Sequence, residues 1–131
     1  MKNLITERFA TNALLSIFSL VMIFHAFVLM GIIPFEIVWG GRLKSKEEMI
    51  PFEITSIALN AVMLTIVVIH AGLLKVKFNP IVLRVAFWFM FALFFMNTIG
   101  NLISNNEFEK MIFTPLTLLL SVFCLRLAMN K

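Results

Sequence analysis

Five polar residues in otherwise apolar stretches of this chain have types and spacings that suit the binding of a polar ligand. Glu53, Ser56 and Asn60 recur at i, i+3 and i+7, which places them on one face of a helix. Asn97 and Asn101 lie four residues apart and also share a helix face. A carboxylate and amide groups on neighbouring helices could hold a cation, an amine or a lipid headgroup through ionic and hydrogen bonds.

His25 is a sixth candidate, because it is the only ionisable residue in the first long apolar stretch. Its imidazole could bind a ligand or exchange a proton with one. It lies eight residues before the end of that stretch, which corresponds to about 12 Å of helix. The alternative interpretation is a histidine that is hydrogen-bonded to a neighbouring helix.

Arg42 is the seventh candidate and lies in the charged segment VWGGRLKSKEEMIPFE. If this segment covered a pocket, Arg42 could pair with an acid or with an anionic ligand. Gly40 and Gly41 permit a tight turn there, and Trp39 suits the headgroup boundary of a membrane. A solvated loop is the alternative interpretation of the segment.

The elements that must position these residues are four long apolar stretches. Of the 131 residues, 61% are hydrophobic and 14% are charged, whereas about a quarter are charged in a typical soluble domain. Each stretch approaches or exceeds the ~20 residues that cross a bilayer as a helix. The sequence therefore predicts an all-α membrane protein, a single integral membrane domain built as a four-transmembrane-helix bundle. Its predicted spans are 10–33, 51–74, 80–103 and 111–129, with an outer loop at 34–50.

The distribution of charge predicts the orientation of this bundle. Seven Lys and Arg residues fall on the side of the two termini and four on the other side, so we expect cytoplasmic N- and C-termini. The formal charge of +4 then reflects topology, and we expect no nucleic acid as a partner because the basic residues form no continuous stripe. We expect a multi-pass protein of a prokaryotic plasma (inner) membrane, with the lipid bilayer as its surroundings.

In this orientation the polar residues of the different spans lie at a similar depth. The first and third spans run outward and the second and fourth run inward, so the candidates inside the spans all fall in the outer half of the bilayer. This predicts a polar pocket that opens outward. The alternative is that these Asn and Ser side chains only hydrogen-bond neighbouring helices and bring them together.

Local signals predict where the helices begin and end. Ser45 and Glu48 form a capping box that starts a helix near Lys46, and Asn79 precedes a proline at the start of the third span. We expect Pro34 to end the first helix. The segments EEMIPFEITSIAL and EKMIFTPLTLLL resemble each other, which agrees with two parallel helical hairpin repeats, although a chance similarity of helix starts explains it equally well.

Common catalytic and cofactor-binding motifs are absent from the sequence. No Walker loop, GxGxxG, HExxH, GxSxG or CxxC occurs, which removes the enzyme classes that these motifs define. His25 and His70 lie near opposite ends of their spans and cannot share one metal ion. We therefore expect no metal and no cofactor, and we assign no catalytic residue.

Three functions remain as hypotheses. The first is a small protein, expected as a homo-oligomer, that binds or transports a small polar or cationic ligand or a lipid headgroup. The second is a membrane-embedded enzyme that acts on a lipid or lipophilic substrate, with His25 or Glu53 as general acid or base. The third is an accessory subunit of a membrane complex. The first is favoured because the polar groups converge in depth while no reaction motif is present.

Overall fold

The protein is an all-helical bundle in the computed structural model, which describes residues 4–38 and 42–129. No strand occurs in this described part. All four α-helices are long and apolar enough to cross a membrane, so the prediction of a four-helix membrane protein is confirmed. The expectations for Trp39, Gly40 and Gly41 lie outside the described residues. The elements are α1 (Glu7–Leu29), the 3-10 turn η1 (Phe35–Ile37), α2 (Lys46–His70), α3 (Pro80–Leu102) and α4 (Glu107–Ala128).

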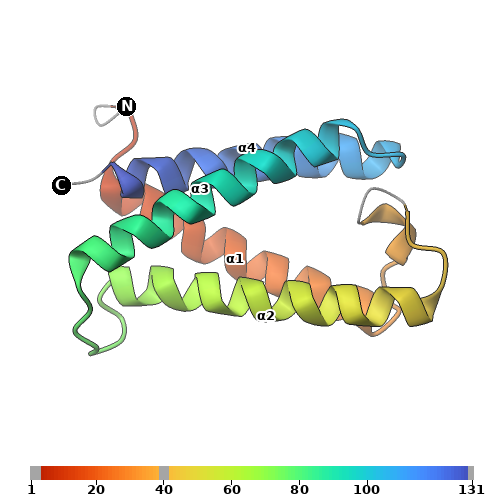
Figure 1. The fold of residues 1–131 in the computed structure, drawn as a ribbon, viewed down its shortest axis with the longest axis horizontal. Helices are drawn as coiled ribbons and strands as arrows, with labels where there is room; N and C mark the ends of the chain where they lie inside the picture. The colour runs from red at the N-terminus through yellow and green to blue at the C-terminus, as the bar shows by residue number, and fades with distance from the viewer. Residues whose placement is uncertain (1–3, 39–41, 130–131) are drawn as a thin grey trace.

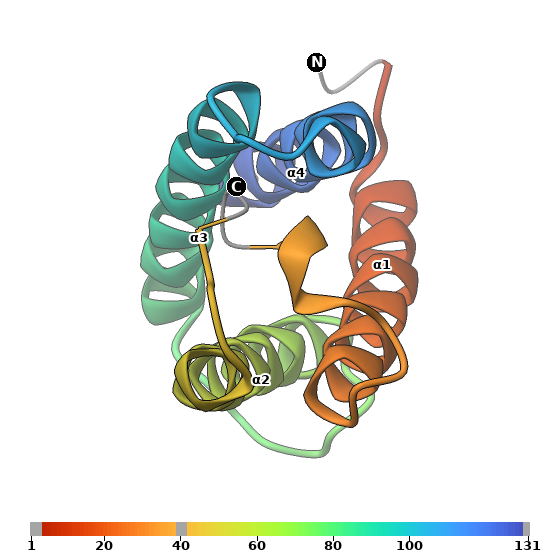
Figure 2. The ribbon, with the colours of Figure 1, turned by 90° about the vertical axis from the view of Figure 1, so that its right-hand side faces the viewer.

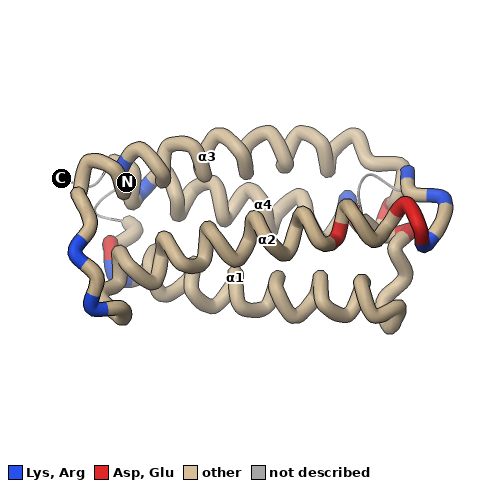
Figure 3. The backbone as a smooth tube through the Cα atoms, turned by 60° about the horizontal axis from the view of Figure 1, so that its bottom comes forward, with Lys and Arg blue, Asp and Glu red and all other residues tan. Residues whose placement is uncertain are grey.

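The four helices run roughly side by side and create two distinct ends. At one end, here the terminal end, α1 begins and α4 finishes (Figure 1). The opposite end, here the distal end, carries η1 and the short α3–α4 connection. Charged residues gather at the two ends, and nearly all the acids lie toward the distal end (Figure 3). The long middle of the bundle is almost free of charge, as a bilayer interior requires.

The helices pack as two pairs. α1 packs along α2 and α3 packs along α4, α1 also touches α4, and α2 has little contact with α3. Toward the distal end the α3–α4 pair diverges from the α1–α2 pair (Figure 1). In the view from the distal end, η1 lies inside the ring of the four helices (Figure 2). The distal half is therefore held together partly by this loop.

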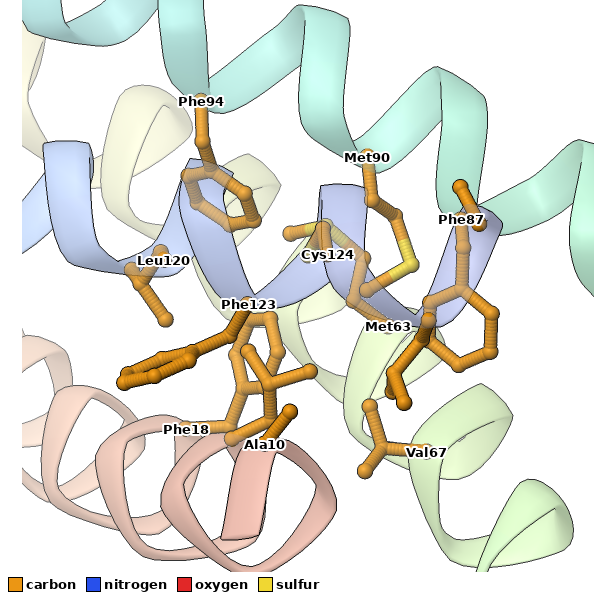
Figure 4. Close-up of a cluster of buried hydrophobic side chains, with 13 residues drawn as sticks. Ala10, Phe18, Met63, Val67, Phe87, Met90, Phe94, Leu120, Phe123 and Cys124 are labelled. Atoms are coloured by element: carbon orange, nitrogen blue, oxygen red, sulfur yellow. The ribbon is translucent and has the colours of Figure 1, made fainter. Parts of the chain in front are cut away.

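A dense apolar core fills the terminal half of the bundle. Phe18 of α1, Met63 of α2, Phe87 of α3 and Cys124 of α4 are among its buried members, and side chains from all four helices meet there (Figure 4). Because lipid is as apolar as these side chains, close van der Waals packing is what stabilises such a core in a membrane. The terminal half is therefore the tightly packed part of the bundle.

The predicted helix starts are confirmed by their capping bonds. The Ser45 hydroxyl accepts from the Glu48 amide at 3.2 Å, and the Glu48 carboxylate reaches back to the Lys44 amide at 2.9 Å. Asn79 caps α3 by accepting from the amide two residues ahead at 2.8 Å. Asn106 caps α4 through the amide three residues ahead at 3.0 Å. Each side chain satisfies an amide that has no partner inside its helix.

One predicted helix end was wrong by several residues. α1 ends at Leu29 and not near Pro34, because Gly31 adopts a φ of 85° that only glycine tolerates easily. The Gly31 amide then bonds the carbonyl of Val28 at 3.1 Å, which is how a glycine C-cap closes a helix. Gly72, with a φ of 79°, follows the end of α2 in the same way. As a consequence His25 lies only about 6 Å from the end of its helix, at 1.5 Å per residue.

Candidate functional site

A cavity of about 700 Å³ lies among the four helices in the distal half of the bundle. Its deeper wall is apolar and includes Ile17, Met63 and Phe94. Six of the seven residues predicted to bind a ligand line it, whereas the seventh, Glu53, does not. The six are His25, Arg42, Ser56, Asn60, Asn97 and Asn101. The structure shows that these six residues line one cavity, whereas their binding of a ligand stays a prediction.

Glu53 contacts His25, which lines the cavity, but does not line the cavity itself. The Nδ1 atom of His25 is 3.0 and 3.1 Å from the two carboxylate oxygens of Glu53. Glu53 has no exposed surface, while 16% of the His25 side chain is exposed. A carboxylate that accepts from Nδ1 fixes the ring and leaves Nε2 for another partner. The expectation that Glu53 itself contacts a ligand is therefore not supported by its position.

The polar stripe on α2 is buried against the rest of the bundle, as the i, i+3, i+7 spacing predicted. Glu53, Ser56 and Asn60 are all buried. Asn60 Nδ2 donates to the carbonyl of Ser56 at 2.8 Å, and no described group bonds the Asn60 Oδ1 atom. Helix rise therefore presents an amide oxygen to the cavity about 10 Å deeper than the His25–Glu53 pair.

The polar residues of α3 have two different roles. Asn101 Nδ2 donates to the Phe113 carbonyl and to the Thr117 hydroxyl of α4, both at 3.3 Å. Thr98 also bonds Thr117, at 3.0 Å, so this part of α3 is joined to α4 as the packing alternative predicted. Asn97 differs, since it is exposed, lines the cavity and makes no hydrogen bond within the described chain.

Glu109 is a lining residue that the sequence did not single out as part of the site. It lies in the first turn of α4, is only 4% exposed and lines the cavity. The Ser104 hydroxyl donates to its carboxylate. The neighbouring Asn106 donates to the Glu36 carbonyl of η1 at 2.9 Å, which ties η1 to the α3–α4 connection. The serine five residues before Glu109 was the one local signal of this arrangement.

Packed rings border the cavity on one side of the bundle, and exposed apolar side chains border it on another. Between α1 and α4 the rings of Phe24 and Phe113 pack edge to face, with centroids 5.1 Å apart. Between α2 and α3 the lining residues Leu59, Leu93 and Met96 are 50%, 37% and 68% exposed. These exposed side chains are apolar and lie on helices that span the membrane, so the opening faces lipid. We call this opening the α2–α3 portal.

A second His–Glu pair joins α1 and α2 at the terminal end. The Nε2 atom of His70 lies 3.1 Å from Glu7 Oε1, which is within salt-bridge distance, although this nitrogen makes no hydrogen bond in the described chain. The α1–α2 hairpin therefore has one such pair near each end, with the acid on α1 at one end and on α2 at the other. Only the His25 pair borders the large cavity.

Comparison with protein-family models, with curated proteins and with solved structures gave no match for this chain. In the described residues no group of three or more His, Cys, Asp or Glu side chains could hold a metal ion. The function must therefore be inferred from the geometry and chemistry of the cavity.

Proposed function

We propose that this protein binds an amphipathic molecule taken from the surrounding bilayer. The observation that carries the proposal is the form of the cavity. Its polar groups lie mainly toward the distal end of the bundle, and its deeper wall is apolar. Its portal opens between α2 and α3 onto lipid. Ligand sites are commonly apolar spaces with a few well-placed polar groups. An amphipathic ligand would match both regions. Its polar head would lie near His25 and the asparagines, and its hydrocarbon part would lie at the apolar wall and the portal.

A lipid-like ligand suits this cavity better than a free small cation. The sequence suggested Glu53 as the partner of a cation, but Glu53 is fully buried and already bonded to His25. A lipophilic molecule can enter sideways through the α2–α3 portal without leaving the membrane.

We expect the protein in a prokaryotic plasma membrane with both termini in the cytoplasm, which puts the cavity in the outer leaflet. Transport to the other leaflet would need a path past the core around Phe18, Met63 and Phe87, which fills the terminal half. We therefore propose binding within one leaflet as the activity of a single chain. Transport would require a homo-oligomer whose interfaces add the missing path.

One observation favours a second candidate function, a membrane-embedded enzyme. A histidine held at Nδ1 by a buried carboxylate is how many general bases are oriented, and His25 borders the cavity. Under this hypothesis, purified protein would turn over a lipid and His25→Gln would abolish that turnover. Binding without turnover favours the first proposal, since binding needs only the cavity.

The test of the binding proposal is ligand-dependent stability in detergent. Protein extracted with a mild detergent should retain a lipid-sized molecule, seen as added mass in native mass spectrometry. Replacing Asn60 with Leu removes a buried amide from the cavity and should reduce this retention and the associated rise in unfolding temperature. Thr65→Val is the matched control, because Thr65 lies on the same helix, is exposed and bonds its own helix at Ala61.

Equal retention of the added mass by the Asn60→Leu and Thr65→Val variants would contradict the proposal, because binding would then not depend on the cavity. The absence of a retained molecule, together with no stabilisation by a total lipid extract, would also contradict it.

A further inference from the structure

The volume of the cavity limits the size of the ligand. At roughly 30 Å³ per non-hydrogen atom, the volume of one water molecule in the liquid, a space of about 700 Å³ holds about 23 such atoms. A long-chain alcohol or a monoacylglycerol has about this size. A phospholipid with two acyl chains has more than twice as many atoms. The second chain would have to lie outside the bundle, where the cavity could not recognise it.

The charged side chains that line the cavity carry opposite signs. Arg42 and Glu109 both line it, one carrying a positive and the other a negative charge. The carboxylate of Glu53 is fully buried and is hydrogen-bonded to His25 Nδ1 across α1 and α2, so it does not face the cavity. A charged headgroup would add a charge that no group here is left to balance, and an unbalanced charge at membrane depth is costly. The charge pattern therefore favours an uncharged head.

The cavity contains hydrogen-bonding atoms that have no partner within the described residues. They favour a ligand that can donate a hydrogen bond. The Nδ2 atoms of Asn60 and Asn101 are already bonded to groups of α2 and α4. Their Oδ1 atoms make no hydrogen bond within the described residues, so they can accept. His25 Nε2 is also without a described hydrogen bond, because the ring bonds Glu53 through Nδ1. A hydroxyl can donate to an amide oxygen and can serve either form of the imidazole, whereas a carboxylate has no hydrogen to donate.

We infer that the ligand is a single-chain amphiphile, or a lipophile of that size, whose head is uncharged and carries a hydroxyl or amide hydrogen. The inference rests on the proposed function and names the class of molecule that the cavity selects. The head lies among His25, Asn60 and Asn101, and the chain lies along the apolar wall of the cavity and ends at the α2–α3 portal beside Leu59 and Leu93.

The test compares probes that share one oleyl chain and differ in the head. Full-length protein in short-chain detergent is titrated with oleyl alcohol, monoolein, oleate, oleylamine and dioleoylphosphatidylcholine. Binding is followed by native mass spectrometry and by the unfolding temperature. Oleyl alcohol or monoolein should bind one to one and at least about tenfold more tightly than oleate, because an anion leaves the amide oxygens without a donor. Oleylamine and the two-chain lipid should also bind more weakly.

Two substitutions in the exposed loop test the charge argument without disturbing the helices. Arg42→Gln removes the cation that opposes Glu109, so the affinity for oleylamine should rise severalfold relative to oleyl alcohol. Lys44→Gln is the matched control, because Lys44 is also an exposed cation of this loop but does not line the cavity. The Lys44→Gln variant should have the same affinity for oleylamine relative to oleyl alcohol as the unchanged protein.

Two kinds of failure can be told apart. If oleate, oleylamine or the two-chain lipid binds most tightly and Asn60→Leu weakens it, the proposed binding function stands and the inferred ligand class is overturned. An equal change of preference in Arg42→Gln and Lys44→Gln also overturns the charge argument. If no probe and no lipid extract binds in a one-to-one ratio, both the inference and the proposed function are overturned.

Discussion

Gly100 offers the most direct way to change the size of the cavity without damaging the bundle. It lines the cavity on α3 together with Leu93 and Asn97, at positions i, i+4 and i+7 of one face. A Cβ atom added at Gly100 would meet no other group within 4 Å. A larger side chain therefore enters open space, and replacing a helical glycine also favours the helix by about 0.5 kcal/mol.

The substitution Gly100→Phe should shorten the ligand that fits best. Its side chain adds seven carbons, which at roughly 30 Å³ each take about 210 Å³ from a cavity of about 700 Å³. The remaining space should hold about seven fewer ligand atoms. In a series of straight-chain alcohols, the chain length that gives the greatest rise in unfolding temperature should therefore decrease by about that number of carbons.

The control for this experiment is Ile99→Phe, which adds the same ring at the neighbouring position. Ile99 is 49% exposed and does not line the cavity, so its ring should enter the lipid and leave the best chain length unchanged. An unchanged optimum in Gly100→Phe would refute the reasoning, and so would an equal decrease in both variants. Loss of folding cannot be mistaken for the effect, because the unfolding temperature without ligand is measured in the same series.

Three further predictions concern the His25–Glu53 pair, a helix start and the topology. Glu53→Leu should lower the free energy of unfolding by about 2 kcal/mol, because it removes the hydrogen bond between the buried carboxylate and His25. Adding His25→Leu should restore part of the loss, and strictly additive losses in a double-mutant cycle would show that the pair does not interact. Ser45→Ala should cost about 1 kcal/mol through loss of the α2 cap, as measured by thermal unfolding, and no loss would mean that another group caps this helix. For topology, Lys44→Cys should react with a membrane-impermeant maleimide added outside intact cells, and Lys75→Cys should not. The one native cysteine should not contribute, because it is buried. The reverse pattern would place the termini outside.

The helices could be predicted from the sequence because their determinants are local. Hydrophobic length sets the spans, and the caps at Ser45, Asn79 and Asn106 lie within three residues of the amides that they bond. α1 ends before Pro34, its predicted end, because Gly31 adopts the left-handed conformation and such a glycine ends a helix by itself. The helix count was therefore correct, whereas one boundary depended on which of two local signals acts first.

The residues that line the cavity could be predicted from the helix face that they share, but their bonding partners could not. Spacing along one helix fixes which residues share a face, so Ser56 and Asn60 were correctly placed together. The contact between His25 and Glu53 joins residues 28 positions apart and depends on how α1 and α2 are rotated about their axes. Hydrophobicity says little about that rotation in a membrane, because lipid and the helix interior are similarly apolar. For the same reason the burial of Glu109 could not be foreseen.

The amides of Asn60 and Asn97 line the cavity on α2 and α3, the two helices that border the portal. α2 has little contact with α3, and neither Asn60 Oδ1 nor the Asn97 side chain has a hydrogen bond within the described chain. On the opposite side of the bundle the rings of Phe24 and Phe113 pack against each other. An amide without a partner in apolar surroundings is costly, and it can be satisfied either by a facing helix or by a ligand. Under the proposed function, the head of the ligand bonds these amides while α2 and α3 stay apart.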